Sequence, residues 1–312
     1  MSEQDIAPGK RPGKRIHRFL QNPVTMKELR SRMRGRRAFV VLTIYLLLMS
    51  GFISLVYGAY TSSAGNPFGP DQRQAGKVLF SAVLGIQVFM VIFIGPAFTA
   101  GAITGEKERQ TFELLRTTLL TAKSFVAGKL ISALSYVLLL IFAAVPLQSI
   151  AFLLGGVSLL ELLLSQLLLV IAAVTFALYG LFCSSALRST LSASVTTFAG
   201  SLFMTLGLPA IIGIFGAFIG PVLASSATLS WVSEALLVYG GLVLAATNLP
   251  ATLIVSDIFL LENDALFFFK SSIGSRSAWL FSPWPLFIVL YLLMAAFFYW
   301  ATVRRVRRIA NK

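Results

Sequence analysis

Residues 38–58 read AFVVLTIYLLLMSGFISLVYG, a run of 21 residues without a charged side chain. A helix that crosses the hydrocarbon core of a bilayer needs about 20 consecutive, mostly apolar residues. Five further apolar runs follow, at 78–103, 130–154, 159–182, 190–220 and 285–303. Because a helix satisfies its own backbone hydrogen bonds in lipid, these runs predict an all-α membrane protein with about six transmembrane helices.

The composition excludes an ordinary water-soluble fold. Hydrophobic residues make up 57% of the 312 residues, charged residues make up 12%, and the mean hydropathy is +0.83. A soluble domain carries about 25% charged residues, because its surface must face water. The net charge of +14 by itself suggests nucleic acid or an acidic membrane surface as a partner, and the placement of the charges decides between them.

The basic residues predict the orientation of the chain. Of 26 lysines and arginines, 22 lie before residue 38, within 105–129, at position 188 or after residue 303. Six spans with a cytoplasmic N-terminus put all 22 on the cytoplasmic side, as the positive-inside rule demands. We therefore expect a multi-pass protein of the cell membrane with both termini in the cytoplasm. The charge then reflects topology and lipid contact, and nucleic acid is not an expected partner.

One apolar stretch, 235–260, does not fit this pattern because Asn248, Pro250 and Asp257 interrupt it. With this stretch as a seventh span, either the 11 basic residues before residue 38 or the five after residue 303 would lie outside the cell. We interpret it as a re-entrant or interfacial hairpin near the outer face, before the last span. A model of eight spans, in which 190–220 is divided near Gly207 and Pro209, is the alternative.

The N-terminal region divides into two parts ahead of a single transmembrane domain, 23–312. Residues 1–22 are rich in Lys, Arg, Pro and Gly and are expected to form a disordered basic cytoplasmic tail. In 23–37, Met26, Leu29 and Met33 recur at helical spacing among arginines. This pattern predicts a short amphipathic helix in the cytoplasmic interface, with a solvated basic tail as the alternative.

The spans lack the groups that enzymes and ion-driven carriers need. Their middles contain no Asp, Glu, Lys, Arg or His, and we expect Gln87, Gln148 and Gln166 to form hydrogen bonds between helices. One histidine and one cysteine make a metal site improbable on composition, and no G-x-x-x-x-G-K-[ST] phosphate loop is present. If the chain transports a substrate, the energy would have to come from another polypeptide.

The charged segment between the second and third spans, 105–129, predicts a contact with a soluble partner. Phe112, Leu115 and Leu119 are spaced as one face of a helix, and charged residues surround them. An apolar stripe of this kind suits docking into a groove on another protein. An interfacial helix that only connects two spans fits the pattern equally well.

Two segments resemble the permease subunits of type 2 ABC transporters. The first is NPVTMKELRSRMRGRRAF, 22–39, which is similar to the N-P-V-x-x-K-E-L-R start of these permeases. The second is ITGEKERQTFELLRTTLLTAKSFVAGKLIS, 103–132, which is similar to their E-[KR]-E-x-G-T-x-E-L-L-L-x-[ST]-P loop followed by Gly-Lys. This chain departs from the pattern at Gln110, where Gly is usual, at Arg116, and at Leu119, where Pro is frequent. The last span, 282–308, also resembles that of the family.

The resemblance implies a transmembrane permease of an ATP-binding-cassette exporter. The apolar spans without charge fit a hydrophobic or amphipathic substrate, and they fit equally well a path formed only at the seam between two permease chains. A separate ATP-binding subunit would bind ATP and Mg and hydrolyse the ATP. This chain would be a non-catalytic subunit without a cofactor of its own. A second permease chain would complete the transporter. The 235–260 segment would be the outer hairpin. A membrane scaffold or assembly factor without a transported substrate is the alternative.

The resemblance also assigns site residues. The coupling helix that contacts the ATP-binding subunit would contain Glu106, Glu108, Arg109, Thr111, Phe112, Glu113, Leu115 and Arg116. The interfacial elbow helix would contain Met26, Glu28, Leu29, Arg30 and Met33.

Overall fold

The computed structural model describes residues 36–63, 72–110, 121–225, 231–263, 265–273 and 276–310. Six helical segments in these ranges are long and apolar enough to cross a membrane, and each overlaps one of the six predicted runs. They are Phe39–Ser62, Arg73–Glu108, Ala122–Leu153, Leu159–Ala186, Thr190–Phe218 and Pro283–Arg308. The prediction of an all-α membrane protein with six spans is confirmed.

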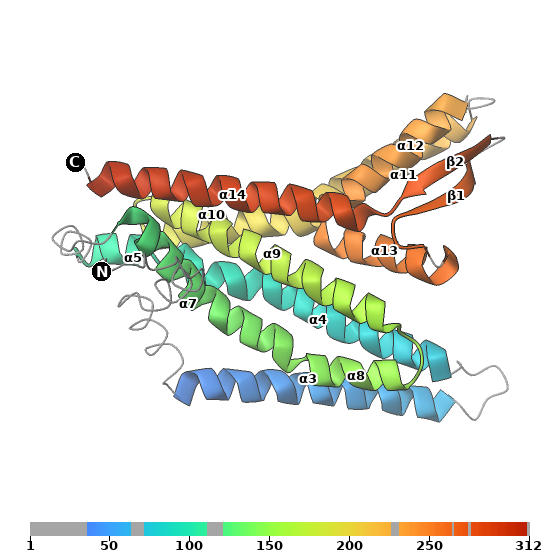
Figure 1. Ribbon diagram of the computed structural model, residues 1–312, viewed down its shortest axis with the longest axis horizontal. Coiled ribbons are helices and arrows are strands. Elements are labelled where there is room, and N and C mark those ends of the chain that lie inside the picture. Colours follow the sequence, from blue (N-terminus) through green and yellow to red (C-terminus); the bar gives the residue numbers. More distant parts are fainter. Residues whose placement is uncertain are drawn as a thin grey trace, which may run out of the picture.

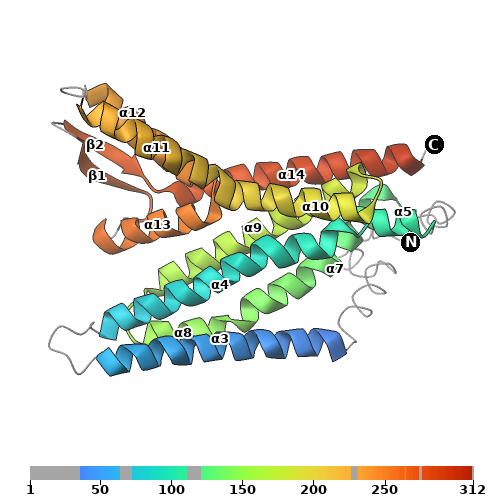
Figure 2. The ribbon, with the colours of Figure 1, turned by 180° about the vertical axis from the view of Figure 1, so that it is seen from behind.

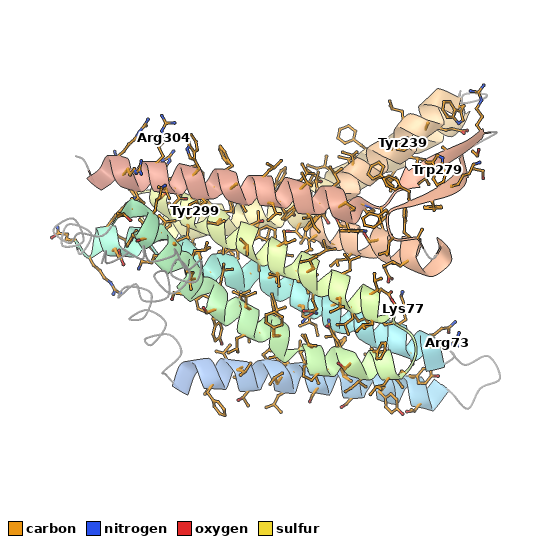
Figure 3. The ribbon with its side chains drawn as sticks, viewed as in Figure 1. Arg73, Lys77, Tyr239, Trp279, Tyr299 and Arg304 are labelled. Atoms are coloured by element: carbon orange, nitrogen blue, oxygen red, sulfur yellow. The ribbon has the colours of Figure 1, made fainter. Side chains whose placement is uncertain are left out.

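The long helices form a bundle with two ends (Figure 1). One end gathers the start of α3 (Arg36–Ser63), the short α5 (Thr104–Glu108) and the end of α14 (Pro283–Ala310), with Arg304 beside it (Figure 3). The opposite end gathers the start of α4 (Gln72–Ala100), with Arg73 and Lys77. We call these the basic end and the outer end, following the orientation that the basic residues predict.

Helix α9 (Leu159–Ala186) lies at the centre of the bundle, between α4 and α14 (Figure 2). Leu168, Leu169, Ala172 and Leu181 on it are completely buried. A helix that is apolar around its whole circumference is stable only where other helices or lipid surround it, which explains this position. By contrast, Phe39 on α3 is 72% exposed, as expected of a helix that faces lipid.

Two of the three prolines in the spans, Pro146 and Pro209, lie at irregularities of the helix, because proline cannot donate a backbone hydrogen bond, whereas the third lies within a continuous helix. Pro96 lies inside α4. Pro146 lies in the first turn of α8 (Val145–Leu153), which continues the span after α7 (Ala122–Ala143) ends. Pro209 follows a π-helical turn, η1 (Phe203–Gly207), which joins α10 (Thr190–Leu202) to α11 (Leu208–Ser225). The chain continues through Gly207 and Pro209 without reversing, so the structure does not divide 190–220 into two spans.

The ambiguous stretch 235–260 forms two shorter helices, α12 (Trp231–Ala245) and α13 (Leu249–Asn263), which meet at a turn (Figure 1). The residues that interrupt the apolar run account for this turn. The side chain of Asn248 accepts a hydrogen bond from the backbone N–H of Ala251 and donates to the carbonyls of Met204 and Thr205 in η1. Asn248 thus caps α13 and also satisfies backbone groups that the π-helical turn leaves available.

A two-stranded antiparallel hairpin lies beside α12 and α13, and the sequence analysis missed it. Strand β1 (Phe268–Ile273) pairs with β2 (Arg276–Phe281), with Phe268 opposite Phe281. Ala278 and Leu280 on β2 are buried against Leu242 of α12 and Phe259 of α13. Two six-residue runs separated by Gly274-Ser275 are a recognisable hairpin signal, which the search for long apolar runs passed over.

Candidate functional site

The base of the predicted coupling loop is tied to the third span by an ion pair. Glu106 on α5 accepts a hydrogen bond from the ammonium group of Lys129, which lies on α7. The side chain of Lys129 is 8% exposed and that of Glu106 is 23% exposed, so water screens the pair poorly. The two residues belong to the two halves of the sequence motif, the acidic run and the Gly-Lys pair, and the structure brings them together.

Glu108 ties the same loop to the fifth span. Its carboxylate accepts hydrogen bonds from the backbone N–H of Thr190 at 2.6 Å and from the Thr190 hydroxyl at 2.7 Å. Thr190 is the first residue of α10, where the helix dipole and unsatisfied N–H groups favour an anion. The next charged residue, Arg109, is exposed at the surface.

Buried hydrogen bonds fix the bend at which α4 passes into α5. The Ser184 hydroxyl accepts from the backbone N–H groups of Ile103 and Thr104, at 2.9 and 3.0 Å. Thr104 and Ser184 are both completely buried. Because Ser184 belongs to α9, the start of the loop is held against the central helix of the bundle.

The loop leaves α5 through a left-handed residue and ends on a helix cap. Gln110 has φ of 57°, a conformation that glycine adopts without strain. The family motif has Gly at this position, and the glutamine of this chain must adopt the same left-handed backbone at a cost in strain. At the other end, the Thr121 hydroxyl accepts a hydrogen bond from the N–H of Ser124 and caps α7.

The remaining predicted contact residues lie outside the described part of the chain. In the coupling helix these are Thr111, Phe112, Glu113, Leu115 and Arg116. In the elbow helix they are Met26, Glu28, Leu29, Arg30 and Met33. Their roles stay predictions.

The three glutamines of the spans form a buried hydrogen-bonded cluster, as predicted. Gln148 donates to Gln87 at 2.8 Å, and Gln166 donates to Gln148 at 2.6 Å. Gln87 in turn donates to the carbonyl of Ile141 at 3.1 Å, near the break between α7 and α8. The cluster joins α4, α8 and α9 in the interior of the bundle.

A group of three charged side chains at the outer end was not predicted. The Lys77 ammonium donates to Glu161 and to Asp257, at 2.8 Å in each case, and so joins α4, α9 and α13. The sequence analysis used Asp257 only as a residue that interrupts an apolar stretch, and it did not single out Lys77 or Glu161. Glu161 also forms a capping box with Ser158 at the start of α9.

The lysine balances only one of these two carboxylates. Burial and the neighbouring carboxyl of Glu161 raise the pKa of Asp257 to about 7, although Lys77 opposes the change. Asp257 lies on the short helix α13, which is not among the six span-length segments.

A cavity of about 240 Å³ lies next to this charged group, between α4, α9 and α13. Its walls are mainly apolar, with Leu84, Leu168 and Leu253 among the lining residues, and Glu161 and Asp257 contribute the charged part. Apolar walls with a few polar groups are typical of ligand sites. Among the described residues, no group of three or more His, Cys, Asp or Glu side chains could hold a metal ion.

Comparison with known families supports the reading of the two motifs. The family model described as ABC-2 type transporter matches residues 22–232, which is more than half of the chain. The match includes the N-P-V segment, the charged loop and five of the six spans. A search of curated proteins gives no match.

Proposed function

The chain belongs to the ABC-2 type transporter family, and from this membership we propose that it is the permease subunit of an ATP-binding-cassette exporter. A separate ATP-binding subunit hydrolyses ATP, and two permease chains form the path through the membrane. The coupling helix in 105–120 contacts that subunit, the elbow helix in 22–37 lies in the cytoplasmic interface, and α12 with α13 enters the membrane from outside.

The observation that carries this proposal is the attachment of the loop to three spans. Glu106 binds Lys129 on α7, Glu108 binds Thr190 on α10, and the α4–α5 bend binds Ser184 on α9. When nucleotide closes the pair of ATP-binding subunits, a force on the loop reaches all three helices at once. Rigid helices that move as bodies then change access to the transport path.

We further propose that the substrate is hydrophobic or amphipathic. The spans carry no ionisable residue near their middles that would coordinate an ion or relay a proton. The cavity between α4, α9 and α13 offers apolar walls and one charged end, which suits a molecule with an apolar chain and a polar group. Export rather than import is part of the same proposal.

The test begins by asking whether a reading frame next to that of this chain encodes a phosphate-loop ATPase without membrane spans, and co-expresses such a protein with this chain. We expect the two proteins to co-purify and to hydrolyse ATP when reconstituted. Leu253→Cys, in a Cys183→Ala background, places a thiol in the cavity between α4, α9 and α13. ATP should change the rate at which this thiol reacts with a maleimide.

Glu113→Ala or Phe112→Ala should abolish that ATP-dependent change while the chain still inserts into the membrane. Glu234→Ala, a carboxylate on α12 at the outer end, is the matched control and should keep the change. Wild-type coupling in the loop variants would count against the coupling helix. A purified complex without any ATPase would favour the scaffold function instead.

A further inference from the structure

A large basic hollow lies at the basic end of the bundle. It has a volume of about 770 Å³ and is lined by Lys107, Ser185, Ala186, Leu187, Arg188, Arg305 and Arg308. Four of these seven residues carry a positive charge, and no lining residue in the described part of the chain is acidic. The cations come from α5, from the turn between α9 and α10, and from α14.

Two of the four cations are held in place by contacts that do not neutralise them. The Lys107 ammonium donates to the carbonyl of Ser185 at 2.9 Å. The Arg305 guanidinium lies over the ring of Phe182, 5.3 Å from its centroid. Neither a carbonyl nor an aromatic ring removes the positive charge, so the four groups repel one another unless an anion joins them.

The surroundings of the hollow indicate the membrane surface. Leu191, one residue into α10 from Thr190, is 76% exposed, and Trp300 on α14 is 55% exposed. The guanidinium of Arg304 lies over the ring of Trp300, 5.1 Å from the ring centroid. Exposed tryptophan next to arginine marks the level of the lipid head groups, and exposed leucine marks the level of the acyl chains.

We propose that this hollow binds the phosphate head group of an anionic phospholipid from the cytoplasmic leaflet, with its acyl chains against the neighbouring lipid-facing helices. An arginine guanidinium can donate two parallel hydrogen bonds to the oxygens of one phosphate. Basic pockets between spans on the cytoplasmic side attract acidic lipids. Such a lipid joins α5, the α9–α10 turn and α14 at the foot of the coupling loop.

The test uses the full chain, purified in a neutral detergent, and phosphatidylglycerol with palmitoyl and oleoyl chains as the probe. Native mass spectrometry counts the lipids retained, and a titration gives the affinity. We expect one tightly held phosphatidylglycerol, and much weaker retention of phosphatidylcholine with the same chains. Arg305→Gln with Arg308→Gln should lower the affinity roughly 25-fold, about fivefold for each arginine.

Arg304→Gln with Arg307→Gln is the matched control, because it removes the same charge from the same helix outside the hollow. The control should retain the wild-type affinity. Equal losses in both double variants would show general attraction to a basic surface and overturn the proposal. If the variant of Arg305 and Arg308 does not fold, Arg188→Gln tests the hollow from another element, with an expected loss of about fivefold.

Two further arms separate other anions from lipid. Inorganic phosphate at millimolar concentration should not displace the lipid, and displacement at that level would mean a site for a free anion. In parallel, a pull-down measures how much ATP-binding subunit co-purifies with each variant of this chain. Loss of that subunit with unchanged lipid affinity would mean that the arginines contact a protein, which would also overturn the proposal.

Discussion

At the scale of single residues, Gln110 shows where the sequence and the backbone disagree. Its φ of 57° lies in the left-handed region, which costs a residue with a side chain roughly 1–2 kcal/mol. Gln110→Gly should therefore stabilise the protein by about 1 kcal/mol, less the added freedom of glycine in the unfolded chain. Gln110→Val should destabilise it by a similar amount, because a branched side chain tolerates this region poorly. Thermal unfolding in detergent measures both changes, and equal stability of the two variants would contradict the prediction.

Asp257 predicts a dependence of stability on pH. Its pKa is about 7 in the folded chain, against an ordinary value of 3.8, so the folded state holds a proton that the unfolded state has released between these values. Stability must then fall as the pH rises from about 4 to 7 and level off above that. Lys77 from α4 and Glu161 from α9 are the described charged groups that face this carboxyl.

The measurement compares wild type with Asp257→Asn between pH 5 and pH 8. We expect the wild type to lose stability relative to the variant as the pH rises, because asparagine has no proton to release. Parallel stability curves over this range would show that Asp257 ionises normally.

At the scale of helices, two glycines on the interface between α4 and α9 differ in what surrounds them. A Cβ atom added to Gly180 on α9 would collide with the side chain of Thr99, which is hydrogen-bonded to the carbonyls of Gly95 and Pro96. A Cβ atom added to Gly95 on α4 would have as its nearest neighbour the carbonyl of Ala173, at 3.9 Å.

Gly95→Ala should therefore stabilise the protein by up to about 1 kcal/mol, the helix preference of alanine over glycine. Gly180→Ala should destabilise it by about 1–3 kcal/mol in spite of the same preference, because the helices must move apart. Denaturant or thermal unfolding of both variants checks the prediction, and a stabilising Gly180→Ala would refute the close packing.

How much of these elements could be predicted depends on the range of the interactions. Span positions follow from local composition, and the six predicted runs were correct. Interhelical bonding of Gln87, Gln148 and Gln166 was predicted because an amide in lipid needs a partner. The partners of Glu106, Glu108 and Lys77 depend on which helices become neighbours, and a single sequence does not encode that locally. The β1–β2 hairpin was missed because each strand has six residues, and the search looked for apolar runs long enough to span a membrane.

At the scale of the whole molecule, the six-span topology depends on α12 and α13 not crossing the membrane. Each has 15 residues and is about 22 Å long, which is short of the ~30 Å hydrocarbon core. The turn between them is held against η1 because the Asn248 side chain donates a hydrogen bond to the carbonyl of Met204. The Thr247 carbonyl in the same turn accepts a hydrogen bond from the Tyr291 hydroxyl of α14 at 3.2 Å. The turn is thus enclosed among spans rather than located at the basic end.

Cysteine labelling of intact and permeabilised cells tests this topology in the Cys183→Ala background. A membrane-impermeant maleimide should label Thr61→Cys and Ser277→Cys from outside, and should label Lys123→Cys only after permeabilisation. All three positions are exposed, so their accessibility depends on the side of the membrane. Thr247→Cys should resist the reagent from both sides. Labelling at Thr247→Cys only after permeabilisation would mean that α12 and α13 each cross the bilayer, which gives eight spans and still leaves both termini and the coupling loop in the cytoplasm. Labelling at Lys123→Cys from outside would instead invert the chain and remove the coupling loop from any cytoplasmic ATPase.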